Sequence, residues 1–304
     1  MNENAIVKWF SLQSRVSETD FPIGIGDDMA EVRLGQDTTV LITTDMLAEG
    51  VHFDLQKSTL EQVGYKAIAV NISDCAAMAT VPVAAVVSVA LPKEYGESEL
   101  KKLHTGITLA CEKFGCVLIG GDITSFKSKE PFVISASMLS RPGVCKPLRR
   151  SGAQIGDCIC VTGTLGGSES GKHLEFEPRL QEALKITGMV NVHSMIDISD
   201  GLSSDLNRIC TSSGVGAIIE AAKIPLSDAA KKKRKPLNAA LNDGEDFELL
   251  FTLSKDDCEE LLNRWRTRTP LTCIGDVNDT GTMQIKMPDD KISILQAGGY
   301  DHLS

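Results

Sequence analysis

Val70-Asn71-Ile72-Ser73-Asp74 is the stretch on which the architecture of this sequence depends. It lies in a run from Ala67 to Ala79 whose other members are Ala, Ile, Val, Cys and Met, a composition typical of a buried segment. An ionised carboxylate in such a run is costly unless a cation or hydrogen-bond donors meet it. Asp74 therefore indicates a binding site more than a solvated surface.

The helix that carries Asp74 is predicted to begin at a cap at Ser58 or Thr59 and to run to about Ala79. Asn71 and Asp74 are three residues apart, so they share one helical face. Runs rich in apolar and β-branched residues predict strands at 40–45, 83–91, 116–119, 132–139, 158–162, 195–198, 217–220 and 249–252. Further helices are expected at 99–114, at 256–265, from Pro178 and after Ser199.

A basic, turn-rich connector runs from Arg141 to Ala153 and divides these elements into two halves. Strands and helices alternate in both halves, but several strands follow one another directly. We therefore expect an α/β (α+β) fold of mixed sheets flanked by helices. The predicted domains are 1–143 and 144–304.

The composition limits the classes of function. The 304 residues carry a formal net charge of −10, which argues against a nucleic-acid partner because nucleic acid rewards a basic face. Nine cysteines without a C-x-x-C pair show neither a disulfide framework nor the spacing of a zinc site, which favours a reducing, cytoplasmic location. We see no signal-peptide pattern and no apolar run of membrane-spanning length, so we expect no membrane partner.

Asp74 is one of several acids that stand at the ends of apolar strands or inside apolar helices beside Gly, Ser or Thr. The set is Asp28, Asp45, Asp74, Asp122, Asp197 and Asp200. Each one alone is better explained as a helix cap or a turn residue. Together they favour a site of hard oxygen ligands for Mg²⁺ or Ca²⁺, with more carboxylates than one ion needs. We therefore expect two or more ions held against phosphate groups.

A rival phosphate site is the glycine-rich stretch Gly166-Gly167-Ser168-Glu169-Ser170-Gly171-Lys172-His173. It nearly fits the P-loop pattern, but His173 cannot supply the hydroxyl that binds Mg²⁺, and Glu169 would direct negative charge at the phosphates. A dinucleotide-binding fingerprint and a nucleophile elbow are both absent from the sequence. The acids remain the better candidate.

Read in order, the motifs of the chain resemble those of the thiamine-monophosphate kinase family, in the aminoimidazole-ribonucleotide-synthetase-like superfamily. The matching segments are Gly24-Ile25-Gly26-Asp27-Asp28, Thr43-Thr44-Asp45, Glu49-Gly50-Val51-His52-Phe53, Lys66-Ala67 through Asp74 to Met78, Gly120-Gly121-Asp122, Arg150-Ser151-Gly152-Ala153, Val161 to Gly166, Asp197-Ile198-Ser199-Asp200-Gly201-Leu202, Gly244-Glu245-Asp246 and Tyr300-Asp301-His302. Any one of these is a weak signal, but the ordered set spans nearly the whole chain.

The resemblance implies ATP-dependent conversion of thiamine monophosphate to thiamine diphosphate by a homodimer of two-domain subunits, with the active site in the cleft between the domains. It implies the Mg²⁺ ligands Asp28, Thr43, Thr44, Asp45, Asp74, Asp122, Asp197 and Asp200. It also implies ATP contacts from Gly121, Asp122, Arg150 and Ser199, and substrate contacts from His52, Glu245 and Tyr300. Catalysis is expected to depend on Asp74, Asp122 and Asp200.

The chain departs from the family pattern at Asp243, at Leu303 and in a shortened segment from Gly166 to Pro178, and none of these removes an expected ligand. Two other functions remain open. One is another ATP-dependent activity of the superfamily, such as amide activation or selenide phosphorylation; the latter would require a reactive Cys near the N-terminus, whereas the first here is Cys75. The other is a non-catalytic nucleotide-binding maturation protein.

Overall fold

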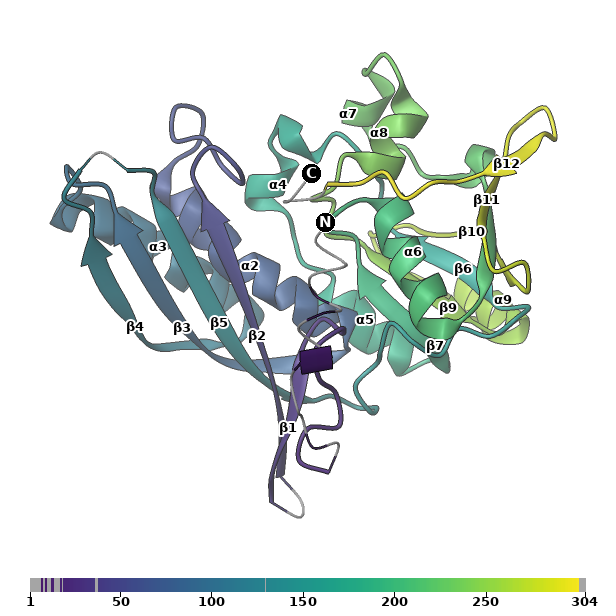
Figure 1. Cartoon of the computed structure of the whole chain (residues 1–304), viewed down its shortest axis with the longest axis horizontal. Coiled ribbons are helices and arrows are strands. Elements are labelled where there is room, and N and C mark those ends of the chain that lie inside the picture. Colours follow the sequence, from purple (N-terminus) through teal and green to yellow (C-terminus); the bar gives the residue numbers. More distant parts are fainter. Residues whose placement is uncertain are drawn as a thin grey trace.

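The structure, a computed structural model, describes residues 7, 9, 12, 13, 17, 19–35, 38–128 and 130–300. Asp301 and His302 of the C-terminal motif lie outside the described residues. Two lobes stand side by side, each built on one sheet (Figure 1). We call them the N-terminal lobe, whose strands fall within 30–142, and the C-terminal lobe, whose strands fall within 158–294.

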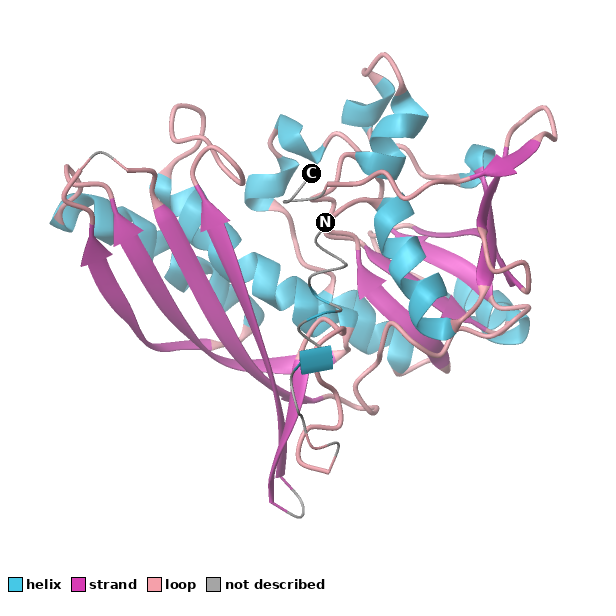
Figure 2. Ribbon diagram, in the orientation of Figure 1, coloured by secondary structure: helices cyan, strands magenta, loops and turns pink. Residues whose placement is uncertain are grey.

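The N-terminal lobe contains a mixed sheet. Its strands are β1 (Ala30–Gly35), β2 (Thr38–Ala48), β3 (Thr80–Leu91), β4 (Val117–Ser125) and β5 (Val133–Pro142). They lie in the order β1-β2-β5-β3-β4, with β3 and β4 parallel and the other neighbours antiparallel. Helices α2 (Leu60–Ala77) and α3 (Glu97–Phe114) cover one face of this sheet (Figure 2), whereas Met46 and Val86 are exposed on the other.

Helix α2 is the central element and begins where the sequence predicts. The Thr59 side chain accepts a hydrogen bond from the Gln62 amide, and the Gln62 side chain accepts one from the Thr59 amide, which forms a capping box. Helix α3 crosses α2 with close backbone contact, since a Cβ on Gly106 would lie 1.8 Å from the Glu61 carbonyl oxygen. The two helices therefore pack as one rigid layer.

The C-terminal lobe is a larger mixed sheet. Its strands are β6 (Cys158–Thr162), β7 (Val192–Asp197), β8 (Gly216–Glu220), β9 (Leu249–Leu253), β10 (Leu271–Asn278), β11 (Met283–Lys286) and β12 (Ile292–Ile294), in the order β12-β11-β8-β10-β6-β9-β7. Its helical segments are η1 (Ser168–Ser170), α4 (Lys172–Glu175), α5 (Leu180–Thr187), α6 (Leu202–Ser213), η2 (Ala221–Lys223), α7 (Asp228–Lys231), α8 (Pro236–Asn242) and α9 (Lys255–Arg264). Strands β8 and β11 are parallel, and the other pairs are antiparallel.

Alternate residues of β6 point to opposite faces of the C-terminal sheet. Ile159 and Val161 join the apolar cluster that packs α6 and α8. Cys158 and Cys160 join the cluster that packs α5 and α9, and this second cluster continues through α2 into the N-terminal lobe. The two lobes therefore share one continuous core on this side.

The structure confirms the prediction of a mixed α/β fold with helices flanking both sheets. The sequence patterns did not predict β1, β10, β11, β12, α7 or α8. The boundary between 143 and 144 falls between β5 and β6 and stays a prediction. Within the described part of the chain, no helix is both long enough and apolar enough to cross a membrane.

Candidate active site

A cleft of about 1070 Å³ is lined by residues of both lobes, and it is large enough for a nucleotide and a second ligand. Every residue predicted for the site lines this cleft except Gly121 and Asp122. The predicted residues that line it are Asp28, Thr43, Thr44, Asp45, His52, Asp74, Arg150, Asp197, Ser199, Asp200, Glu245 and Tyr300. The fold thus gathers residues that lie up to 272 positions apart, counted from Asp28 to Tyr300 (300 − 28).

Three carboxylates form the centre of the cleft. Asp28 precedes β1, Asp74 lies on α2 and Asp197 ends β7, and one ligand atom from each lies within 4.8 Å of the others. The Thr43 hydroxyl donates to Asp74 Oδ2 at 2.5 Å, and the Ser73 hydroxyl donates to Asp197 Oδ2 at 2.5 Å. The second of these hydrogen bonds joins the two lobes.

The charges of these acids oppose one another. Burial, followed by the nearby carboxylates of Asp45, Asp197 and Asp28, raises the pKa of Asp74 well above its ordinary value. Burial, followed by the Asp28 charge, raises the pKa of Asp197 in the same way and that of Asp45 to about 6. Asp45 Oδ2 is buried and has no hydrogen-bond partner among the described residues. Convergent, under-compensated carboxylate oxygens fit a hard divalent cation.

Two arginines border the carboxylates. Arg150 Nη2 lies 2.6 Å from Asp28 Oδ1, and its Nη1 donates to the Gly26 carbonyl at 3.2 Å, which ties the interdomain connector to the loop before β1. Arg208, on α6, pairs with both Asp200 and Asp205. Both guanidinium groups line the cleft and so place fixed positive charge beside it.

Behind His52 and Glu245, which line the cleft, sequence reasoning missed the role of Lys66. Its Nζ lies 2.5 Å from Glu245 Oε1 and donates to the His52 carbonyl at 2.7 Å, and its side chain is fully buried. Glu245 has a positive φ of 53°, an uncommon conformation that this ion pair helps to hold. The signal in the sequence was a lysine at the start of the same apolar run that contains Asp74.

Gly121 and Asp122 lie on β4, away from the cleft. The strand register pairs Asp122 on β4 with Ser88 on β3. Asp45 lies on β2, in the adjacent row of paired residues across the sheet, and strands β5 and β3 separate it from β4. Three strand spacings separate β2 from β4, or about 14 Å. A Cβ on Gly121 would lie 1.9 Å from the Val87 carbonyl oxygen, so this glycine is required by strand packing. Within one chain, Asp122 does not join the other acids.

The near-P-loop does not place its lysine in the cleft. Lys172 Nζ lies 2.8 Å from Glu248 Oε1, and Glu248 also accepts hydrogen bonds from Arg179 and Thr162. This buried network ties α4 and α5 to β9. The arrangement supports the interpretation that the glycine-rich stretch is not a P-loop.

Comparisons with known proteins place these features in a family. The model of the AIR synthase related protein N-terminal domain matches residues 26–141, and that of the C-terminal domain matches 154–287. The chain is 38% identical over 292 residues to a thiamine-monophosphate kinase of Rhodopirellula baltica, covering 92% of this chain and 91% of that protein. It is 32% identical over 312 residues to the thiamine-monophosphate kinase of Bacillus subtilis, covering 94% and 95%.

Solved structures agree with these relatives. The structure of AaThiL complexed with AMPPCP and TMP superposes with a TM-score of 0.83 and 32% sequence identity, over 99% of this chain and 97% of that one. A hydrogenase maturation protein HypE in complex with ATP has a TM-score of 0.72 at 15% identity, over 88% of this chain and 87% of that one, and shares the fold alone. The expected two-domain superfamily fold is therefore confirmed.

Proposed function

The chain belongs to the thiamine-monophosphate kinase family of AIR synthase related proteins, and from this premise we propose that it transfers the γ-phosphoryl group of ATP to thiamine monophosphate. The products are thiamine diphosphate and ADP. The observation that carries this proposal is the convergence of Asp28, Asp74 and Asp197 in a cleft lined by both lobes. A relative solved in complex with AMPPCP, an ATP analogue, and TMP supports it.

The donor set of the cleft fits Mg²⁺. We propose that several ions are held by Asp28, Thr43, Thr44, Asp45, Asp74, Asp197 and Asp200. When bound, these ions supply the positive charge that two approaching phosphate groups require. The chain contributes buried carboxylates whose mutual repulsion a bound cation would relieve.

The side chains of the cleft position the two substrates. The acceptor is a phosphate monoester whose oxygens are already ionised near neutral pH, so the chain need not supply a general base. We propose that Arg150 and Ser199 contact ATP and that His52, Glu245 and Tyr300 contact thiamine monophosphate. Lys66 acts through two of these residues, because its Nζ holds the Glu245 carboxylate and the backbone carbonyl of His52 in place. In-line transfer then requires alignment and charge neutralisation, with no covalent enzyme intermediate.

The uncovered face of the N-terminal sheet supports a homodimer. We define the open sheet face by Thr44, Met46, Val86, Val117 and Asp122, which the strand register places on the side away from α2 and α3. Met46, Val117 and Val86 are 62%, 61% and 39% exposed, an apolar surface that favours burial against a second copy. Asp122 lies on this face and Thr44 lies on it at the cleft side. We propose that Asp122 of a second copy completes the set of acids around Thr44.

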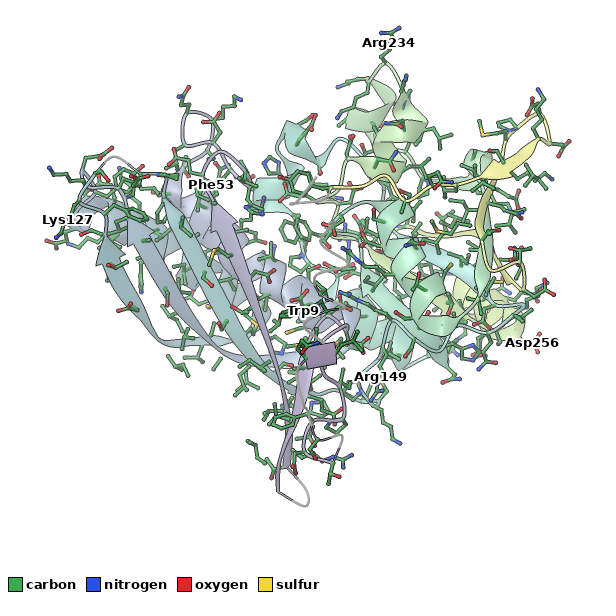
Figure 3. All side chains as sticks on the ribbon, in the orientation of Figure 1. Trp9, Phe53, Lys127, Arg149, Arg234 and Asp256 are labelled. Carbon is green, nitrogen blue, oxygen red and sulfur yellow. The ribbon has the colours of Figure 1, made fainter. Side chains whose placement is uncertain are left out.

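The direct test is incubation of the protein with ATP, Mg²⁺ and thiamine monophosphate, followed by measurement of thiamine diphosphate and ADP. We expect both products in equal amounts. The Asp74→Asn variant should lose activity by about a hundredfold or more while it keeps its fold, because charge around the phosphates is the largest catalytic contribution. Asp256→Asn is the matched control, since Asp256 lies at the outer edge of the C-terminal lobe (Figure 3).

Other outcomes of this assay separate the remaining functions. ADP formation only with a different acceptor would indicate another activity of the superfamily. ATP binding without turnover would indicate a nucleotide-binding scaffold. Near-normal turnover by Asp74→Asn at saturating Mg²⁺ would contradict the proposed cation site.

The cysteines support a cytoplasmic location for this activity. None of the nine forms a disulfide, and most are buried. Thiols persist in this state in a reducing compartment. We therefore keep the proposal that the kinase works in the cytoplasm.

A further inference from the structure

Four of the nine cysteines meet in the C-terminal lobe, outside the cleft. Cys158 and Cys160 lie on β6 and face α9, Cys273 is the cross-strand neighbour of Cys160 on β10, and Cys258 lies on α9 above them. The sulfur atoms of Cys158, Cys258 and Cys273 lie within 4.8 Å of one another. The sulfur of Cys160 lies 3.6 Å from that of Cys258.

These distances discriminate between possible roles. A disulfide requires a sulfur–sulfur distance of about 2.05 Å, well below the spacing found here. Four thiolates around one tetrahedral zinc ion, each about 2.3 Å from the metal, stand roughly 3.8 Å from one another. Cys160 lies outside the group of three sulfurs that are all within 4.8 Å of one another, so its sulfur must move closer to become a fourth ligand. The observed spacings, 3.6 Å between Cys160 and Cys258 and up to 4.8 Å among Cys158, Cys258 and Cys273, bracket the value for a tetrahedral zinc site. They also leave no room for the inorganic iron and sulfide of a cluster between the thiols.

The position of the group suits a soft cation. Cys160 is fully buried, but Cys273 is only half-buried and gives an ion a route from solvent. Thiolate ligands select soft or borderline metals over Mg²⁺.

We propose that Cys158, Cys160, Cys258 and Cys273 bind one Zn²⁺ ion as a structural site that fastens α9 to β6 and β10. Each thiol gives its proton to solvent as its sulfur–zinc bond forms, and no redox change takes place. All four ligand positions are occupied by protein, so the ion has no open position for substrate. The sequence did not reveal this site because the ligands lie 98 and 15 residues apart along the chain, from Cys160 to Cys258 and on to Cys273 (258 − 160 and 273 − 258).

The experiment uses the full chain with cobalt as a spectroscopic probe. We expect about one zinc per chain after gel filtration, and replacement by Co²⁺ should give intense visible bands of a tetrahedral ion with thiolate-to-metal charge transfer in the near ultraviolet. Co²⁺ on the carboxylates of the cleft cannot give that charge transfer because it has no sulfur ligand. The charge transfer therefore reports the cysteine site even when the kinase proposal fails.

Cys273→Ser is the variant of choice because its side chain is half-buried and its loss is least disruptive to folding. It should bind zinc at least tenfold more weakly and change the cobalt spectrum. Cys145→Ser is the matched control, a half-buried cysteine outside the group, and should leave both unchanged. In unmodified protein, a mercurial thiol reagent should release one zinc per chain. Absence of bound zinc, equal effects of the two variants, or a Cys160–Cys258 disulfide in the isolated protein would each overturn the proposal.

Discussion

At the scale of single residues, the acids of the cleft oppose folding when no cation is present. Burial and like-charge repulsion raise the pKa of Asp45, Asp74 and Asp197 together. A carboxyl group whose pKa is higher in the folded state than in the unfolded state stabilises the fold only while it is protonated. At neutral pH the ionised acids of the cleft therefore lower the free energy of unfolding, and contacts elsewhere in the protein offset this loss. Such a loss of stability is typical of binding sites.

Asp45→Asn tests this cost in EDTA. The unfolded carboxyl has its ordinary pKa of 3.8, whereas burial raises the pKa of the folded Asp45 carboxyl to about 6. The stability that this group contributes to the wild-type protein is therefore lost as the pH rises through that window. The variant lacks the penalty and should be more stable than wild type by about 1–3 kcal/mol at pH 8, with no difference near pH 4. Urea unfolding across that pH range measures the difference.

Two controls keep this result interpretable. Asp54→Asn, at an exposed carboxylate in the same cleft, should give no such gain at pH 8. Excess Mg²⁺ should reverse the order and stabilise wild type over Asp45→Asn, because a ligand that binds only the folded state adds to its stability. A difference that stays constant from pH 4 to pH 8 would show that repulsion at Asp45 is not its cause.

Lys66 offers a second test at this scale. Lys66→Met leaves the Glu245 carboxylate without its buried partner and frees the His52 backbone. We expect KM for thiamine monophosphate to rise about tenfold while KM for ATP stays nearly unchanged, together with a stability loss of about 1–3 kcal/mol. Steady-state kinetics with each substrate varied in turn, with urea unfolding, measures both effects.

Lys57→Met is the matched control, because Lys57 lines the cleft and pairs with Asp54 at the surface, where an ion pair contributes little. The double variant Lys66→Met with Glu245→Gln should recover part of the lost stability, since the unpaired charge is then removed. Equal rises in KM for both substrates would instead indicate general damage to the cleft.

The sequence predicts most members of this site because the cost of a buried carboxylate is visible locally. Asp74 stands out in an apolar run, and Asp197 ends an apolar strand. Lys66 was missed because its partner lies 179 residues away and no local pattern connects them. The cysteine group was missed for the same reason, since its members look like ordinary apolar residues of separate elements.

At the scale of elements, α2 depends on a close crossing with α3. Gly106→Ala would place a methyl group 1.8 Å from the Glu61 carbonyl oxygen, so the two helix backbones must move apart. We expect a stability loss of about 1–3 kcal/mol or more, with a lower thermal midpoint. Gly35→Ala is the control, because a Cβ there meets nothing within 4 Å. Equal midpoints for the two variants would show that the crossing tolerates a side chain.

Elements differ in how well the sequence determines them. Helix α2 and strand β3 are long and are defined by their own composition, so both were predicted near their observed limits. Strand β1 and the short strands β11 and β12 were missed, because pairing with distant neighbours defines them more than their composition does. Helix α8 has only 7 residues, too short to show a helical period.

At the scale of the whole molecule, the shared core makes α2 the support for both halves of the cleft. Residues of α2 pack against α5 and the strands of the C-terminal lobe through one apolar cluster, and Ser73 on the same helix bonds to Asp197. The two lobes are therefore expected to unfold together in a single transition. Separate expression of 1–143 or 144–304 would expose part of that core.

The open sheet face predicts that the active unit is larger than one chain. Met46→Glu places a charge on this surface and should convert the proposed dimer to a monomer with little change in fold, because Met46 is 62% exposed in the single chain. Light scattering coupled to gel filtration measures the mass. A monomer in the unmodified protein would remove the basis of the dimer proposal.

Mixed dimers then test whether Asp122 acts across the interface. Asp74→Asn and Asp122→Asn should each be inactive alone. The two variants are unfolded and refolded together in equal amounts, so that half of the dimers are mixed. If Asp122 acts in the cleft of the partner chain, each mixed dimer has one intact site and one doubly altered site. The mixture then recovers about a quarter of wild-type activity. If Asp122 serves its own chain, every site carries one substitution and no activity returns. If Met46→Glu in both chains then removes the recovered activity, the second copy is required for catalysis. Within one chain, the strand register keeps Asp122 three strands away from Asp45.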